Sequence, residues 1–202
     1  MIKQIKDTIS KMEKDKKRLD IYRYLKEQWK CYPESSQLSV LIIQQMVSFL
    51  LELESPWAIS ENANEYQCYA AFLQEVLQYG IQYHSKSKMF LWQLCYYLAG
   101  ISTYHFLYGK VIQLGSAKDL LNQLLDQADK LFPDSKLFQL IPLFQKADTS
   151  WKAKLQKSEV VSIRNEIAEW NLQANAVDQE LLDLFDFPDK SISGELPAKQ
   201  NH

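Results

Sequence analysis

Histidine is the residue that most often performs acid and base catalysis near neutral pH, and this chain contains three histidines. His84 follows a predicted helix, where the helix dipole favours a cation. His105 lies within the aromatic stretch FLWQLCYYLAGISTYHFLYG, residues 90–109. A single histidine among aromatic rings is typical of a hydrogen-bonded core residue, and His202 stands apart at the last position. We therefore expect no catalytic residue, and an enzyme with a helical pocket around His105 remains an alternative.

Metal and cofactor sites require several ligands or a phosphate cradle at short spacings, and the sequence has none of these patterns. It contains no Cys-x-x-Cys, no His-Glu-x-x-His and no Asp-rich calcium loop. Gly109 and Gly115 lack the Lys-Ser or Lys-Thr that completes a nucleotide loop. We therefore expect no metal and no cofactor. The three cysteines, Cys31, Cys68 and Cys95, are odd in number and far apart, which is typical of reduced thiols in the cytoplasm.

Charge is balanced over the whole chain but differs between its two ends. The 23 Lys and Arg face 25 Asp and Glu, so no general attraction to nucleic acid or to anionic lipid is expected. Residues 1–30 hold ten cations and five acids, interleaved at the spacings of a solvated helix face. Residues 159–189 hold eight acids and one cation. We expect no nucleic-acid partner, and Asp7 interrupts the apolar core that a secretion signal requires.

The acidic segment has its carboxylates on one side of a predicted helix. Helical spacing separates them from the packing residues Ile163, Ile167 and Trp170. A second short helix carries further acids. An ordinary solubilising surface has this pattern, and so has a docking surface for a basic protein, because complementary charge speeds encounter and adds specificity. The candidate partner-binding acids are Glu159, Glu166, Glu169, Glu180 and Asp183.

Apolar residues recur with a helical period in every long segment, which predicts an all-α protein. Residues 90–109 cannot form a membrane span, because Gln93, Ser102, Thr103 and His105 lie inside the stretch. Both faces of this helix are apolar, so we expect it to be the central helix of the fold. The predicted helices cover residues 2–31, 36–54, 60–83, 90–113, 117–132, 149–175 and 178–185, and Pro142 splits residues 135–148 into two short pieces. We expect one domain over residues 1–187 and a disordered tail over residues 188–202.

One window resembles the tetratricopeptide repeat, a helix pair that stacks into peptide-binding arrays. It contains Tyr108-Gly109, Gly115, Leu121, Leu125, Ala128 and Pro133. No second copy at a fixed period is visible, so the sequence predicts an irregular antiparallel bundle or a TPR-like stack of about seven to nine helices. This resemblance implies an adaptor, chaperone or regulator that holds a peptide in a helical groove near Tyr104 and Tyr108.

The chain also resembles, in size, helicity and acidic surface, the helical immunity proteins of bacterial toxin systems such as contact-dependent inhibition. That resemblance implies a cytoplasmic, non-enzymatic protein that neutralises one folded partner. The expected partner is a basic toxin domain of the nuclease type, bound through the acidic surface. We take this as the leading functional hypothesis and the TPR-like adaptor as its alternative.

Overall fold

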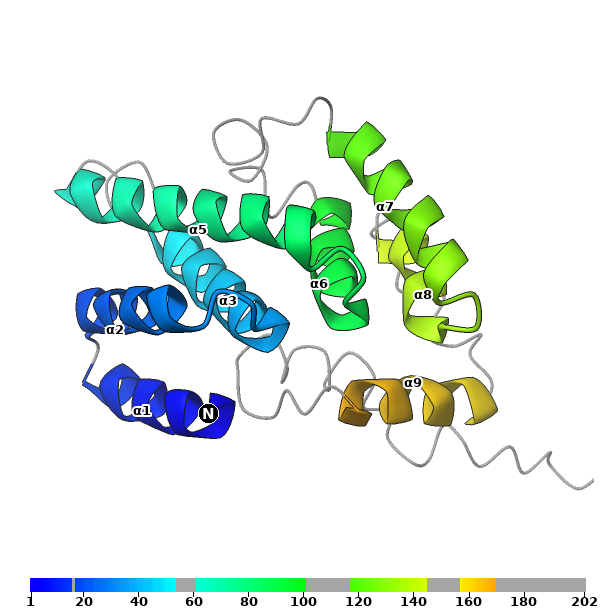
Figure 1. The fold of residues 1–202 in the computed structure, drawn as a ribbon, viewed down its shortest axis with the longest axis horizontal. Helices are drawn as coiled ribbons and strands as arrows, with labels where there is room; N and C mark the ends of the chain where they lie inside the picture. Colours follow the sequence, from blue (N-terminus) through cyan, green and yellow to red (C-terminus); the bar gives the residue numbers. More distant parts are fainter. Residues whose placement is uncertain (16, 54–60, 101–116, 145–156, 170–202) are drawn as a thin grey trace, which may run out of the picture. The chain divides into compact units, whose positions relative to one another are not determined.

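The computed structural model describes residues 1–15, 17–53, 61–100, 117–144 and 157–169, and these residues form helices joined by short turns (Figure 1). The predicted all-α class is confirmed. Contacts divide the chain into two compact units, Met1–Asp148 and Thr149–His202. The helices are α1 (Ile2–Lys14), α2 (Arg18–Cys31), α3 (Ser36–Glu52), α5 (Ala63–Tyr83), α6 (Lys88–Ala99), α7 (Ala117–Leu131), α8 (Lys136–Phe144) and α9 (Lys157–Glu169).

Six helices of the first unit form three consecutive pairs, α2 with α3, α5 with α6, and α7 with α8, each joined by a four-residue turn. The turns span residues 32–35, 84–87 and 132–135, and each begins with an aromatic ring or imidazole and ends with serine. The backbone N–H of the final serine donates to the carbonyl of the first turn residue, at 3.1 Å for Ser35, 2.8 Å for Ser87 and 3.0 Å for Ser135. The three helix pairs are therefore connected by turns of the same type.

The turn serines explain why the second helix of each pair starts where it does. Ser35 Oγ accepts a hydrogen bond from the backbone N–H of Leu38 at 3.2 Å, and Ser87 Oγ accepts one from Phe90 at 3.4 Å. A serine at this position satisfies an N–H that the helix itself leaves without a partner. The serines recur at intervals of about 50 residues, a period found in helical repeat proteins. The sequence analysis missed this repeat because it searched the helices, whereas the shared residues lie in the turns.

Hydrogen bonds join the first turn to the second and the second turn to α7 of the next helix pair. His84 Nε2 lies 3.1 Å from the carbonyl oxygen of Pro33, and Gln127 Nε2 donates to the carbonyl of Ser85 at 2.8 Å. His84 is 7% exposed and ends α5, as the sequence predicted for this residue. The successive helix pairs of the first unit are therefore held in register at their turns.

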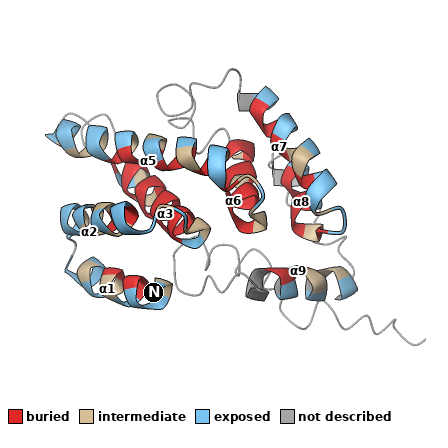
Figure 2. Ribbon diagram, in the orientation of Figure 1, coloured by how far each residue is buried: buried red, intermediate tan, exposed pale blue. Residues whose placement is uncertain are grey.

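The core of the first unit is centred on α3 and α6, which pack against each other (Figure 2). Almost every residue of α6 is buried, as predicted for a central helix. Gln44 of α3 donates to Gln93 of α6 at 3.0 Å, and both side chains are about 1% exposed, which fixes the register of the two helices. Among the described helices, none is both long and apolar enough to cross a membrane.

Two predicted features of the helices are wrong. The expected helix over residues 2–31 is two helices, because α1 ends at Lys14 and α2 begins at Arg18. Pro142 does not split its segment, since α8 continues through it to Phe144. Proline costs about 3 kcal/mol inside a helix. Here Pro142 is exposed and close to the end of α8, while Leu137, Phe138 and Ile141 of the same helix are buried, so packing offsets the cost.

The other helix bounds agree with the sequence analysis to within a few residues at the ends that are described. Helix α3 starts at Ser36 as expected, and α5 starts three residues later than expected. The second half of the predicted 90–113 helix, the 178–185 helix and the 188–202 tail lie outside the described residues.

Candidate binding groove between α2 and α5

Helices α2 and α5 run parallel, because residues later in α2 contact residues later in α5. Tyr22 packs edge to face against Phe72 with ring centroids 5.7 Å apart. Two turns further along α2, Trp29 packs in the same way against Tyr79 at 5.2 Å. Trp29 Nε1 also donates to the carboxylate of Glu75 at 3.2 Å. Large side chains thus join the two helices while holding their backbones apart.

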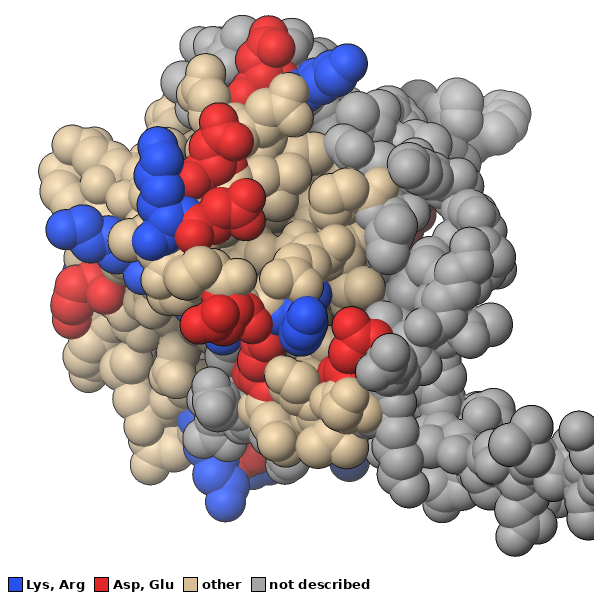
Figure 3. All heavy atoms as spheres, turned by 90° about the vertical axis from the view of Figure 1, so that its right-hand side faces the viewer, with Lys and Arg blue, Asp and Glu red and all other residues tan. Residues whose placement is uncertain are grey.

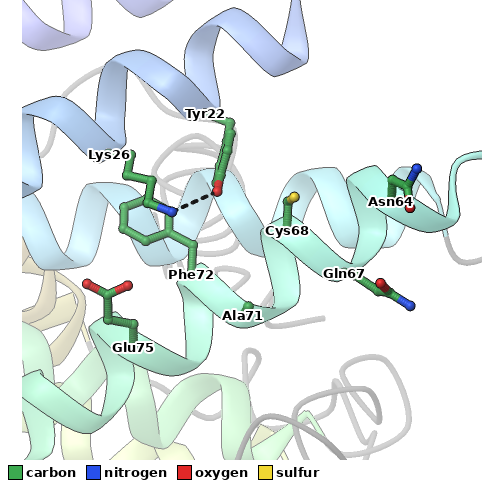
Figure 4. Close-up of a pocket in the computed structure, with 8 residues that line it drawn as sticks. All are labelled: Tyr22, Lys26, Asn64, Gln67, Cys68, Ala71, Phe72 and Glu75. Carbon is green, nitrogen blue, oxygen red and sulfur yellow. Dashed lines mark hydrogen bonds between the residues drawn. The ribbon is translucent and has the colours of Figure 1, made fainter.

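A surface groove of about 410 Å³ lies between these helices, and we call it the α2–α5 groove (Figure 4). Its aromatic wall consists of Tyr22, which is half-buried, and Phe72, which is only 1% exposed, so Tyr22 provides most of the accessible ring surface. Polar side chains from α5 occupy the opposite end in Figure 4, where Asn64 and Gln67 are both exposed. The complete lining is Tyr22, Lys26, Asn64, Gln67, Cys68, Ala71, Phe72 and Glu75.

Lys26 is the cation of the groove. Its Nζ atom donates a hydrogen bond to the hydroxyl of Tyr22 at 3.2 Å and lies 6.0 Å from the centre of the Phe72 ring. The hydrogen bond to Tyr22 raises the pKa of Lys26, while partial burial opposes that change. The amine is therefore protonated at neutral pH. A protonated amine is positively charged and donates hydrogen bonds, so it can bind an anionic group, and it is not a nucleophile.

Acidic and basic side chains are paired beside the groove rather than inside it. Arg18 Nη1 lies 3.1 Å from the carboxylate of Glu52, and its Nε atom lies 4.0 Å from that of Glu65. Glu65 in turn accepts a hydrogen bond from Tyr69 at 2.9 Å. Burial and this bond to a carboxylate both raise the pKa of the Tyr69 phenol, so Tyr69 stays neutral. These contacts anchor α2 to α3 and α5.

Of the partner-binding residues predicted from sequence, the structure describes the side chains of Glu159 and Glu166. Glu159 is half-buried and Glu166 is 8% exposed, so Glu166 offers little surface to a partner. The side chain of Glu169 is not described. Glu180, Asp183, Tyr104, Tyr108 and His105 lie outside the described residues.

Acidic side chains do gather on another helix of the described chain. Asp126 and Asp129 are exposed on α7, and neither forms a salt bridge within the part of the chain that the structure describes. Figure 3 shows acidic spheres interspersed with fewer basic ones on the side of the molecule that it faces. Exposed Lys118 and Lys130 on the same helix reduce the local excess of negative charge.

The described residues offer little for other chemistries. They contain no group of three His, Cys, Asp or Glu side chains placed to share a metal ion. Cys95 is fully buried, and burial raises the pKa of its thiol to about 12, so it is not a reactive thiolate. Cys31 and Cys68 are exposed free thiols, and Cys68 lines the α2–α5 groove.

The sequence analysis missed the α2–α5 groove because it depends on a pairing between distant helices. Trp29 and Glu75 are 46 residues apart in sequence. A signal was available in the aromatic residues Tyr22 and Trp29, which lie seven residues apart on one side of α2, but such spacing is also typical of core packing. Comparison with known proteins finds no matching family model, no matching curated protein and no matching solved structure.

Proposed function

We propose that this protein is a non-enzymatic protein-binding module whose α2–α5 groove receives an extended segment of a partner protein. The observation that carries the proposal is the groove of about 410 Å³, with an aromatic wall and two exposed side-chain amides. Aromatic rings provide apolar contact area. The amides of Asn64 and Gln67 can pair with backbone N–H and C=O groups.

An extended segment fits this lining better than a helix does. The backbone groups of a helix are satisfied internally, whereas those of an extended peptide require partners when it is bound. Asn64 and Gln67 lie one helical turn apart on α5 and supply both donors and acceptors. Helix-pair repeats commonly bind peptides on the surfaces that their stacked helices create, and this chain has such pairs with a shared turn.

A display experiment with random peptides tests the proposal. The full chain is immobilised, binding peptides are selected, and their affinity is measured for wild type and for two variants. Ala71→Trp fills the groove from an exposed lining position on α5. Asn122→Trp adds a similar ring at an exposed position on α7. We expect Ala71→Trp to weaken the selected peptides at least tenfold and Asn122→Trp to leave them unchanged. Equal binding to both variants contradicts the proposal.

A second candidate is the neutralisation of a basic toxin domain, which the acidic residues of α7 favour. Asp126 and Asp129 supply exposed negative charge where Glu166 does not. The segment 170–189, on which this hypothesis also depends, lies outside the described residues. If the hypothesis is correct, Asp126→Lys combined with Asp129→Lys slows association with the toxin and reduces the salt dependence of the rate. An unchanged association rate rejects a role for α7 in this binding.

A further inference from the structure

The cations of α2 differ in one respect, which is whether a carboxylate compensates their charge. Arg18 pairs with Glu52 and Arg23 pairs with Asp20, at 3.1 and 3.5 Å. Lys30 pairs with Glu27 at 2.8 Å. Within the described part of the chain, Lys26 forms no salt bridge, and its hydrogen-bond partner is the neutral hydroxyl of Tyr22. The cation of α2 without a carboxylate at salt-bridge distance is therefore the one inside the groove, although the more distant carboxylate of Glu75 still favours its charged form.

Lys26 and Tyr22 together provide several donors at one place. An ammonium group has three N–H donors, and one of them is used on the Tyr22 oxygen. Because that oxygen acts as the acceptor, the phenol keeps its own O–H as a further donor. Figure 4 shows the Lys26 amine and the Tyr22 hydroxyl facing each other, with Cys68 and Gln67 nearer the start of α5. A carboxylate that reaches this position can accept from both residues.

The acidic residue in the groove does not occupy this position. Glu75 accepts a hydrogen bond from Trp29 Nε1, and its carboxylate lies beyond salt-bridge distance from Lys26. In Figure 4 the Phe72 ring lies between Lys26 and Glu75, whereas Cys68 and the two amides lie on the other side. An incoming carboxylate can therefore approach Lys26 from the amide end, away from Glu75.

We propose that the segment bound in the α2–α5 groove carries an Asp or Glu side chain whose carboxylate pairs with Lys26 and Tyr22. This inference deepens the proposed function and depends on it. Asn64 and Gln67 hold the neighbouring peptide backbone, and the carboxylate determines the register of the segment in the groove. Charge-assisted bonds between an ammonium and a carboxylate are stronger than neutral ones, so this contact provides the specificity of the groove.

Two pools of blocked peptides test the inference. Both contain random peptides of about ten residues with acetylated and amidated ends, and other acidic residues are excluded. One pool has a fixed central Glu and the other a fixed central Gln, so the side chain is the sole source of a carboxylate. The measured quantity is the ratio of Glu to Gln peptides retained by the immobilised full chain.

Lys26→Gln is the test variant and Lys30→Gln is its matched control, because both remove one charge from α2. Lys30 is exposed and already paired with Glu27. We expect wild type and Lys30→Gln to prefer the Glu pool about fivefold, the strength of a partly exposed ion pair, and Lys26→Gln to show no preference. Tyr22→Phe removes the second donor and lowers the preference about twofold. A preference that survives in Lys26→Gln overturns the inference.

The Ala71→Trp variant separates this inference from the proposed function. If Ala71→Trp retains neither peptide pool and Lys26→Gln still prefers the Glu pool, the groove binds peptides but Lys26 does not bind their carboxylate. If Ala71→Trp retains both pools, the groove is not the binding surface and both proposals fail. A thermal melt of each variant that matches wild type establishes that the changes act on binding and not on folding.

Discussion

Helix α5 has two sides that differ in how closely the neighbouring helix approaches. On the α6 side, Gly80 is buried and a Cβ atom placed there would overlap the ring of Phe90, so the ring lies directly against the α5 backbone. On the α2 side, the aromatic residues Tyr22, Trp29, Phe72 and Tyr79 separate the two helices. Gly80 allows one close contact with Phe90 near the turn between α5 and α6, whereas large rings leave space between α5 and α2.

This difference indicates which part of α5 supports the fold and which part is available for binding. The distance between packed helices depends on the side chains at the contact. Val76, Leu77 and Gly80 of α5 are buried, and α3 is the helix that packs most extensively against α5, whereas Cys68, Ala71 and Glu75 are exposed along the α2–α5 groove. A helix fixed on one side can serve as a rigid wall for a ligand on the other.

The largest expected effect comes from removing a core side chain on the closed side. Leu94 of α6 is 1% exposed, so Leu94→Ala should lower the free energy of unfolding by about 2 to 5 kcal/mol through lost burial and a cavity. The matched change on the open side, Ala71→Trp, should alter it by less than about 0.5 kcal/mol, because the residue is exposed. Urea denaturation measures the free energy of unfolding of both variants. A comparable decrease in the two would mean that the groove is part of the core.

The thiols give a second measure of the same contrast. Cys95 is buried on α6 with its pKa raised to about 12, while Cys68 is exposed on α5. We expect Cys31 and Cys68 to react with a thiol reagent at pH 8 at least about a hundredfold faster than Cys95, which needs local unfolding. Because folding raises the pKa of Cys95 above its usual value of 9.0, its contribution to stability is complete below pH 9 and is lost as pH rises towards 12. Three equally fast thiols would contradict the closed packing of α6.

Gly80→Ala tests the close approach directly. In an exposed helix this change stabilises by up to about 1 kcal/mol, because alanine has the higher helix propensity. Here the added methyl must displace the Phe90 ring, so we expect a net loss of about 1 to 3 kcal/mol. Phe90→Leu should recover part of that loss in the double variant. A stabilised Gly80→Ala protein would show that α5 and α6 are not in direct contact at this position.

The smallest expected effect concerns the turns that the helix pairs share. Ser35→Ala and Ser87→Ala each remove a helix cap and should each cost about 1 kcal/mol. Ser36→Ala is the control for the first pair, because Ser36 lies inside α3 and not at its cap. If the turns are repeats of one another, Ser35→Ala and Ser87→Ala should lower the free energy of unfolding by similar amounts. Thermal melts of the three variants measure this.

Local features of this fold could be predicted from sequence. The Ser35 cap, the end of α5 at His84 and the burial of α6 follow from residue types and helical spacing within one segment. The break at Asp15 was missed because Met12 and Leu19, on either side of the interruption at Lys16, are two helical turns apart and so keep the same face. Pro142 was misread because the packing of α8 offsets a local cost. The repeat was missed because its signal is limited to an aromatic or histidine residue and a serine in each turn.

The candidate site could not be predicted in the same way. The groove requires α2 and α5 to lie parallel, which depends on contacts between residues far apart in sequence, such as Trp29 with Glu75. The acidic strip was inferred from helical spacing, which separates faces but does not say which face is covered. Glu166 shows this limit, since spacing predicted exposure and the structure buries it.

A peptide titration followed by amide NMR tests the central claim most directly. The ligand is the tightest peptide from the display selection, and the observed quantity is the chemical-shift change of each backbone and side-chain amide. The account predicts the largest changes at the side-chain amides of Asn64 and Gln67 and at the backbone of Cys68 and Ala71, with Ala71→Trp abolishing them. Changes centred on Asp126 and Asp129 of α7, with the groove amides unmoved, would contradict it.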